Sequence, residues 1–500
     1  MPAASLLARR TEFSTEDSDA LLRAIPAAPG VLALRGADPA SEPYLTRTTD
    51  LRRRARRLLA PPEALNEDGT PILSKRLNLR ERVCWIEYTR TGSDFESTLV
   101  LYRASREAFG AEEARRRLHL HTPTFLRMTM ENAYPRMYAT NRLSKKALAE
   151  FFGPFPSRAA AERYCDAVLD LFQIRRCHED LEPFPEHPGC VYGEMKKCMA
   201  PCKAGAMQGC SREELDARYA AEAKRVFAFF ETRGQSMLEE IAAEREAASQ
   251  AMDFERAAAL HKQWEKVRAA SLLADELVRP VTELRAIVVQ EAVPGKGDIP
   301  SDSAALFMLA HGRIAGPEAL STLGVRAVRE QTTVGSSLFA QPLMISPVPE
   351  TETKVASIVT PEDRARDAIA GLEEQTREQP EIAELCDYLS LFRRWYYRPE
   401  RQRAGEVLLP NAQEEWPLRR LLNAAARVVL GPPAQLDSVN REAARATPKN
   451  AKTKTIHAGR EGVESDVLVL PKRARSRKAI TPAEATTQPS KGPGNSEIEE

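Results

Sequence analysis

The sequence lacks a long apolar run, a secretory leader and a large net charge of either sign. No stretch approaches the roughly 18 apolar residues of a membrane span. The apolar stretch at the N-terminus is too short for a signal peptide and leads directly into Arg9 and Arg10. We therefore expect a cytoplasmic protein that contacts no membrane. Because the formal charge is +1 over 500 residues, attraction to nucleic acid has to come from local patches, and the length predicts three or four domains.

Cysteine is scarce, but its distribution is informative. The chain has eight cysteines, and four of them follow the spacing Cys177-x12-Cys190-x7-Cys198-x3-Cys202. Thiolates gather in this way either as disulfides or around a soft metal centre, and an intracellular location disfavours disulfides. The spacing suits an iron–sulfur cluster or a tetrahedral zinc ion. The alternative is a set of unrelated buried thiols.

Residues 20–130 are predicted to form a small α/β domain. Residues 31–34 and 83–88 are strand candidates, Asp50 is placed to cap a helix over 51–59, and residues 98–102 open another helix. The cysteine-bearing segment follows at 131–210, with a helix predicted over 157–173 because its apolar residues recur at helical spacing.

Residues 211–275 predict long helices, because the segment is rich in Ala, Glu and Arg and contains no Pro. The pattern breaks at Met252, where Asp253 can cap a second helix, so a helical hairpin is expected. One stripe of the second helix comprises Phe254, Ala257, Ala258, His261, Trp264 and Val267. This stripe is expected to pack either on the body of the protein or on a partner.

Residues 280–430 are predicted to form a mixed α/β region. Strands are expected at 286–289 and 304–310, and helices at 361–396 and 414–429. The tail at 431–500 is polar, with a basic run at 471–478, and is predicted to be disordered. The fold class is therefore multidomain α+β, with a disordered basic tail that can dock on a phosphate backbone in a salt-dependent way.

Two basic faces are candidates for phosphate contact. The predicted helix over 51–59 carries a dense set of arginines, and a second set follows at 115–117. Such faces hold phosphates without reading sequence; the alternative is a solvated surface. The arginines of the first set are Arg52, Arg53, Arg54, Arg56 and Arg57.

Four pieces of the chain, in this order, resemble the UvrC family of excinucleases over roughly residues 20–400. The first is Pro-Gly-Val at 29–31 with Tyr44 and the run at 50–54. The second is Tyr-Pro at 134–135 with Phe-Phe-Gly-Pro-Phe-Pro at 151–156. The third is Cys-Met-Ala-Pro-Cys at 198–202, and the fourth is Met-Asp-Phe-Glu-Arg-Ala-Ala at 252–258. The order of all four pieces makes the resemblance specific.

The resemblance implies a function for each piece. Residues 20–130 are similar to a GIY-YIG endonuclease domain, here degenerate, which grips DNA through Arg47 and the arginines of the first basic face. The cysteine quartet would hold a [4Fe–4S] cluster, with zinc as the alternative and Cys165 and Cys210 as bystanders. Residues 211–275 would be a UVR hairpin that binds the helicase UvrB. Its expected contact residues are Phe254, Ala257, Ala258, His261 and Trp264.

The catalytic pieces depart from the family pattern. A GIY-YIG nuclease uses one divalent cation, here Mg or Mn if the site is active, and tyrosines that position water. Leu32 replaces the first tyrosine and Thr46 replaces a glycine, so Tyr44 and Arg54 are the remnants of the site. Leu101 stands where the metal-binding glutamate is expected; Asp94 or Glu96 is a conceivable substitute. Whether the protein is an enzyme is therefore uncertain.

The family's second nuclease, an RNase H-like domain, is expected after the strands of the 280–430 region. Too few ordered residues remain before the tail for that domain or for the helix-hairpin-helix pair that ends the family pattern. The favoured interpretation is a nucleotide excision repair protein that binds damaged double-stranded DNA together with UvrB, with weak or lost incision. The alternatives are an active GIY-YIG endonuclease that cuts the damaged strand and a redox-responsive DNA-binding protein that uses the cluster.

Overall fold

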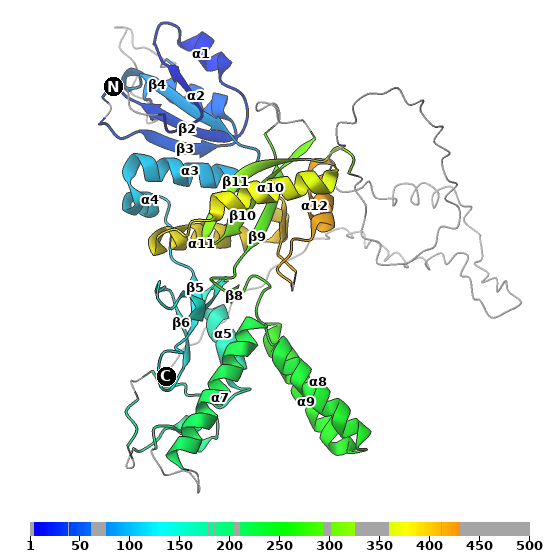
Figure 1. Ribbon diagram of the computed structural model, residues 1–500. Helices are drawn as coiled ribbons and strands as arrows, with labels where there is room; N and C mark the ends of the chain where they lie inside the picture. Colours follow the sequence, from blue (N-terminus) through cyan, green and yellow to red (C-terminus); the bar gives the residue numbers. More distant parts are fainter. Residues whose placement is uncertain are drawn as a thin grey trace, which may run out of the picture. The chain divides into compact units, whose positions relative to one another are not determined.

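The computed structural model describes most of the chain as far as residue 430 (Figure 1). The described residues are 5–38, 40–61, 77–178, 181–184, 187–203, 211–293, 302–325, 360–411 and 413–430. The predicted tail and Cys210 lie outside these ranges. Among the helices in them, none is both long enough and apolar enough to cross a membrane.

The N-terminal part is an antiparallel sheet with strand order β1-β4-β2-β3. Its elements are β1 (Arg9–Glu12), α1 (Ser18–Ala24), β2 (Gly30–Arg35), β3 (Tyr44–Thr48), α2 (Leu51–Leu59), the short 3₁₀ helix η1 (Arg80–Arg82) and β4 (Trp85–Arg90). Alternate residues of β2 point to opposite faces: Leu32 and Leu34 pack with α1 and α2, whereas Val31 and Ala33 pack with α3 (Asp94–Phe109).

Local capping sets the helix boundaries of this part. The Asp50 carboxylate accepts a hydrogen bond from the Arg53 amide at 2.8 Å, so α2 begins where the sequence predicted. Helix α3 begins at Asp94 and not at the expected residue 98, because the Ser93 hydroxyl accepts a hydrogen bond from the Glu96 amide at 3.1 Å. The predicted strand 83–88 lies two residues later in the chain, as β4.

The middle part combines a second antiparallel sheet, of order β6-β5-β7-β8, with long helices. Large aromatic residues fill the core between them, among them Phe152, Tyr164 and Phe230. The elements are α4 (Ala111–Arg117), β5 (Thr124–Met128), β6 (Met137–Thr140), η2 (Leu148–Glu150), β7 (Phe151–Phe155), α5 (Arg158–Leu169), α6 (Val191–Glu194), α7 (Arg212–Glu231), α8 (Gln235–Gln250), α9 (Phe254–Ser271) and β8 (Arg279–Pro280).

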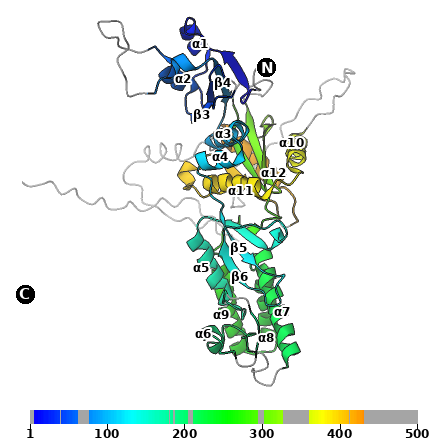
Figure 2. The same ribbon diagram turned by 90° about the vertical axis from the view of Figure 1, so that its left-hand side faces the viewer.

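The helical segment after residue 211 is divided twice. The first break, at Arg233 and Gly234, is an additional one that separates α7 from α8; both residues adopt positive φ. The second break is the predicted one. Met252 adopts the left-handed conformation (φ 57°), and the amides of Asp253 and Met252 donate to the carbonyls of Ala248 and Ser249 at 2.9 and 3.0 Å. This Schellman-type turn folds α9 back along α8 as the expected hairpin (Figures 1 and 2).

A third antiparallel sheet, of order β11-β10-β9-β12, forms the last part. The two central strands, β9 and β10, are mostly or fully buried because helices cover both faces of the sheet, with α11 on one and α10 and α12 on the other. The predicted helix 361–396 is two helices, separated by a segment that includes Pro380. The elements are β9 (Ala286–Glu291), β10 (Ser303–Ala310), β11 (Arg313–Ser321), α10 (Pro361–Thr376), α11 (Ile382–Tyr396), η3 (Glu400–Gln402), β12 (Glu406–Leu408) and α12 (Leu418–Leu430).

Helix α3 joins the first and third sheets. Its Phe95 ring packs against Trp395 of α11 and Phe307 of β10, with centroids 5.0 and 5.2 Å apart. The hydrophobic core of the third sheet therefore includes residues from the region predicted as a separate domain at 20–130. The α+β class is confirmed; the assignments of GIY-YIG, cluster-binding and UVR units stay predictions.

Candidate functional site

The two predicted catalytic remnants lie in contact. Arg54 of α2 donates from Nη2 to the hydroxyl of Tyr44 on β3 at 2.5 Å, and its guanidinium carbon is 6.0 Å from the ring centroid. Leu32 lies on the same face of the sheet, since Leu34 pairs with Tyr44 and Leu32 with Thr46. The side chain at position 32 adds hydrocarbon to the core beneath this pair and has no group that can position water.

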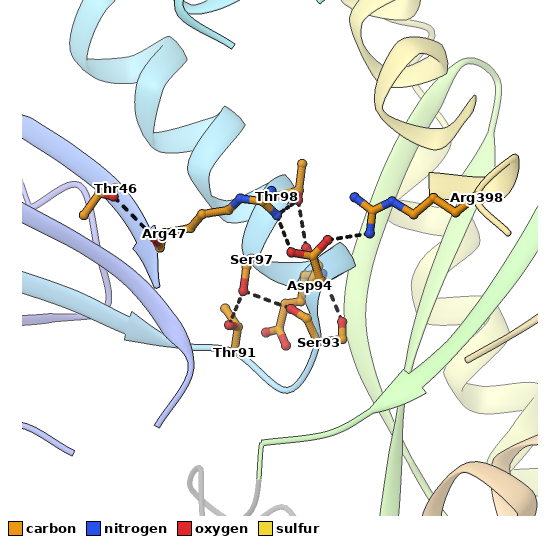
Figure 3. A network of polar contacts seen from close by, with 9 residues as sticks. Thr46, Arg47, Thr91, Ser93, Asp94, Ser97, Thr98 and Arg398 are labelled. Atoms are coloured by element: carbon orange, nitrogen blue, oxygen red, sulfur yellow. Dashed lines mark hydrogen bonds and ion pairs between the residues drawn. The ribbon is translucent and has the colours of Figure 1, made fainter. Parts of the chain in front are cut away.

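The carboxylates near the expected metal site are engaged in other contacts. Leu101 packs against the apolar cluster that contains Val31 and Ala33. Glu96 is 2% exposed, and its Oε2 accepts from the Gly92 amide at 2.7 Å. Asp94 is ion-paired with Arg47 and Arg398 (Figure 3). Within the described ranges, no three His, Cys, Asp or Glu side chains are grouped so that they could hold a metal ion.

Three of the six arginines predicted to contact DNA are exposed on α2. These are Arg53, Arg56 and Arg57. Arg52 is partly buried and donates from Nε to the Ile25 carbonyl at 2.7 Å. Of the remaining two, Arg54 donates a hydrogen bond to Tyr44 and Arg47 forms an ion pair with Asp94. Because Leu51, Ala55, Leu58 and Leu59 are buried, α2 presents its other face as a row of positive charge.

The second basic set is paired within the protein. Arg115 makes two bonds to the Asp387 carboxylate, from Nε at 2.7 Å and from Nη2 at 3.1 Å. Arg116 and Arg117 both bond Glu113, and their hydrogen bonds lower the pKa of that carboxyl to about 2. The three guanidiniums therefore lie beside compensating negative charge.

Asp387 is a polar residue that the sequence-based prediction missed. It is 2% exposed on α11, and its Oδ2 also accepts from the Tyr102 hydroxyl of α3 at 3.1 Å. Burial, followed by the charge of Asp387, raises the pKa of Tyr102. The sequence signal was an aspartate inside the apolar run of residues 385–392, which predicts a buried partner. This contact ties α11 to α3 and α4.

The four cysteines lie in one neighbourhood. Cys198 and Cys202 are each 6% exposed, and Cys177 and Cys190 are half-buried. Burial raises the pKa of Cys198 to about 12, and the neighbouring thiols of Cys190, Cys177 and Cys202 also contribute to the rise. A metal ion would reverse this shift, because coordination stabilises the thiolate.

Donors that stabilise sulfur are also present in this neighbourhood. The Ala200 amide lies 3.3 Å from the sulfur of Cys198, and Arg175 Nη1 lies 3.7 Å from that of Cys177. The donor types therefore fit a thiolate-bound metal centre. In the geometry described, however, no three of the four sulfurs are grouped so that they could share a metal ion, so the quartet stays a prediction.

The predicted partner-binding stripe divides into an exposed tip and a packed body. At the tip of the hairpin, Met252 and Phe254 are 78% and 70% exposed. Ala258 and His261 are also exposed, whereas Ala257 and Trp264 are half-buried against the core of the middle part. The His261 ring stacks on Trp264, with centroids 6.3 Å apart. The stripe is therefore available to a partner mainly at its N-terminal end.

Comparison with known proteins supports the class of the central part. The family model for the UvrC/Cho excinuclease middle domain matches residues 124–229. UvrABC system protein C of Actinobacillus succinogenes is 28% identical over 253 residues, or 51% of this chain and 38% of the relative. The protein of the same name from Pseudomonas syringae pv. syringae is 31% identical over 186 residues, 37% of this chain and 28% of the relative. No solved structure matches significantly.

Residues 124–229, which comprise the second sheet without β8, helix α5, the cysteine segment and most of α7, are therefore of the UvrC/Cho excinuclease middle-domain class. This chain is similar to these UvrABC system C proteins over 37 to 51% of its length. It matches less than half the length of each of these curated relatives.

Proposed function

We propose that this protein acts in nucleotide excision repair as a UvrC-like factor that binds a UvrB-type helicase and damaged double-stranded DNA, with weak or absent incision. Two features of a UvrC-like chain carry this proposal together. The tip of the helical hairpin is apolar and exposed, and Leu101 occupies the position where a metal-binding carboxylate is expected. The surfaces proposed to bind the partner and the DNA are present, whereas side chains expected for nuclease catalysis are replaced.

Partner binding is assigned to the tip of the α8–α9 hairpin. Met252 and Phe254 flank the capping residue Asp253, whose carboxylate accepts from the Arg256 amide at 3.0 Å. The cap fixes the backbone of this turn, so both apolar side chains are presented at the tip of the hairpin. Large apolar residues that are exposed together often mark a protein–protein contact. The partner proposed is a similar hairpin on UvrB.

DNA binding is assigned to the exposed face of α2. Arg53, Arg56 and Arg57 lie on a helix whose opposite face is anchored in the first core. A rigid row of guanidiniums neutralises backbone phosphates without reading bases. This assignment predicts binding with a strong dependence on salt and little dependence on sequence.

Weak incision is proposed from the side chains that replace the catalytic groups. A divalent cation stabilises developing charge and lowers the pKa of bound water. Each loss of about 1.4 kcal/mol in transition-state stabilisation slows the reaction tenfold, so loss of the ion costs several powers of ten. Asp94 and Glu96 are the nearest substitutes in sequence, and both are already engaged at the start of α3.

A [4Fe–4S] cluster on Cys177, Cys190, Cys198 and Cys202, with zinc as the alternative, belongs to the same proposal. Two of these thiols are buried and all four are neighbours. When bound, the centre would supply a structural cross-link between the loop after α5 and the segment after α6. The alternative function, a DNA-binding protein that responds to redox conditions through its cluster, would require the same four cysteine ligands.

The proposal is tested by mixing the protein with a UvrB-type helicase on a duplex that carries one bulky lesion. A native gel should show a ternary complex that contains this protein. The same band obtained without UvrB would contradict the partner role, and a band that forms equally on undamaged DNA would contradict the repair role.

One observation favours an active nuclease as the second candidate. The Tyr44–Arg54 hydrogen bond of 2.5 Å keeps a phenol and a guanidinium together at the remnant site. A plasmid-nicking assay with Mg²⁺ or Mn²⁺ distinguishes the two functions. Metal-dependent nicking by the wild type that disappears in Arg54→Ala would establish the nuclease and overturn the proposal of weak incision.

A further inference from the structure

One carboxylate joins two arginines from distant parts of the chain. Asp94 Oδ1 accepts from Arg47 Nη1, and Asp94 Oδ2 accepts from Arg398 Nη1 at 2.7 Å. Figure 3 shows Asp94 at the first turn of α3, with Arg47 reaching it from β3 and Arg398 from the segment after α11. The two guanidiniums therefore hold the two oxygens of a single anion between them.

The position of Asp94 is fixed by its helical turn. The Thr98 hydroxyl donates to the Asp94 carbonyl at 2.8 Å and accepts from Arg47 Nη1 at 3.0 Å. Ser93 caps the same turn, and the Ser97 hydroxyl donates to the Ser93 carbonyl at 2.9 Å. The carboxylate is thus presented from a rigid support, and a small pocket lined in part by Asp94, Thr98 and Arg398 lies beside it.

Positive charge exceeds negative charge at this contact. Arg394 of α11 lines the same pocket. Burial lowers the pKa of Arg394, and the positive charges of Arg393, Arg47 and Arg398 lower it further. Arg394 donates to the carbonyls of Leu118 and His119, so it contributes charge but is not itself a free ligand. One aspartate here faces three arginines.

The contact is open to solvent. The side chains of Asp94, Arg47 and Arg398 are 48%, 44% and 28% exposed. Ion pairs with this exposure contribute little stability, because water competes with both partners. The backbone of a duplex can compete with the carboxylate, because many closely spaced phosphates together attract the two guanidiniums.

We propose that Asp94 is an internal substitute for a DNA phosphate, and that Arg47 and Arg398 form a phosphodiester site that this carboxylate blocks. A phosphodiester presents two unesterified oxygens, as a carboxylate does, and guanidinium groups bind both. The inference rests on the proposed function, because it assumes that the protein binds DNA. It adds a residue outside the first domain, Arg398, to the binding surface and gives Asp94 an autoinhibitory role.

The test compares Asp94→Asn with a matched control, Glu113→Gln, in the full chain. Both remove one negative charge that pairs with two arginines; the side chain of Asp94 is 48% exposed and that of Glu113 is 26% exposed. Binding to a fluorescent duplex is measured by anisotropy across a salt series. Asp94→Asn should bind about two- to fivefold more tightly than Glu113→Gln at low salt. The slope of log affinity against log salt should be steeper by about one, for one additional phosphate contact.

A double variant tests whether Arg398 is responsible for the gain in affinity. Arg398→Gln added to Asp94→Asn should remove the gain in affinity and restore the original salt slope. Equal affinities for Asp94→Asn and Glu113→Gln, with wild-type binding intact, would overturn the blocked site but leave DNA binding in place. No binding by the wild type or by either variant would overturn both this inference and the proposed function. Circular dichroism of each variant verifies its fold.

Discussion

Substitution of Phe254 by alanine gives the most quantitative test of the partner surface. A phenylalanine side chain presents about 150–250 Å², and 70% of Phe254 is exposed. A partner can therefore cover roughly 100–175 Å², which at about 25 cal/mol per Å² is at most about 2.5–4.5 kcal/mol. Ordering and imperfect contact reduce the gain, so we expect a loss near 2 kcal/mol, or about 30-fold in Kd.

Isothermal titration of the protein with a UvrB-type helicase measures this loss. Leu272→Ala is the matched control, because Leu272 is 74% exposed at the opposite end of the same helix. The control should bind as the wild type does, and neither variant should lower the melting temperature, since both side chains are exposed. A Phe254→Ala protein that keeps full affinity, or a Leu272→Ala protein that loses as much, would refute the assignment of the hairpin tip.

Three further outcomes follow from buried polar groups and thiols. Asp387→Asn leaves Arg115 without its buried carboxylate and should lower the free energy of unfolding by about 3 kcal/mol in urea denaturation; a change below about 1 kcal/mol would contradict the role of this contact. Burial and the neighbouring Glu131 raise the pKa of Glu150 from 4.5 to about 7, so this group makes the folded state less stable as pH rises from 4.5 to about 7. Glu150→Gln should therefore raise the melting temperature by about 1–2 °C at pH 8 and leave it unchanged at pH 5, whereas an equal effect at both pH values would argue against the shift. Anaerobically purified protein should contain about four irons and absorb visible light, and Cys198→Ser should lose both; one zinc per chain would select the alternative metal, and no metal would remove the cluster from the proposal.

Local sequence signals predicted many of the elements because their causes are local. Asp50 caps α2, and alternation within a short apolar run gives β2. The break at Met252 was also predicted, because Asp253 is a strong capping residue. The turn between α7 and α8 lacked such a cap, and only Gly234 marked it. The split of the predicted 361–396 helix was available from Pro380 but was outweighed by the helical composition around it.

The contacts between distant segments could not be predicted from the sequence. Asp94 meets Arg398, and Asp387 meets Arg115, across more than 250 residues of chain. Nothing in the spacing of these residues identifies the partner of either aspartate. In the second basic set, the partner of Arg115 depends on how α4 packs against α11. Arg116 and Arg117 instead pair with Glu113 one helical turn away, a local pairing that the sequence-based assignment to phosphate did not consider.

The central claim, that binding persists while incision is weak or lost, is tested most directly by strand cleavage on a lesion-bearing duplex. This protein is added to a preformed complex of that duplex with a UvrB-type helicase in Mg²⁺ or Mn²⁺, and the DNA is resolved on a denaturing gel. We predict that the protein joins the complex and the labelled strand stays intact. A discrete incision product on the damaged strand, absent when Arg54→Ala replaces the wild type, would contradict the account.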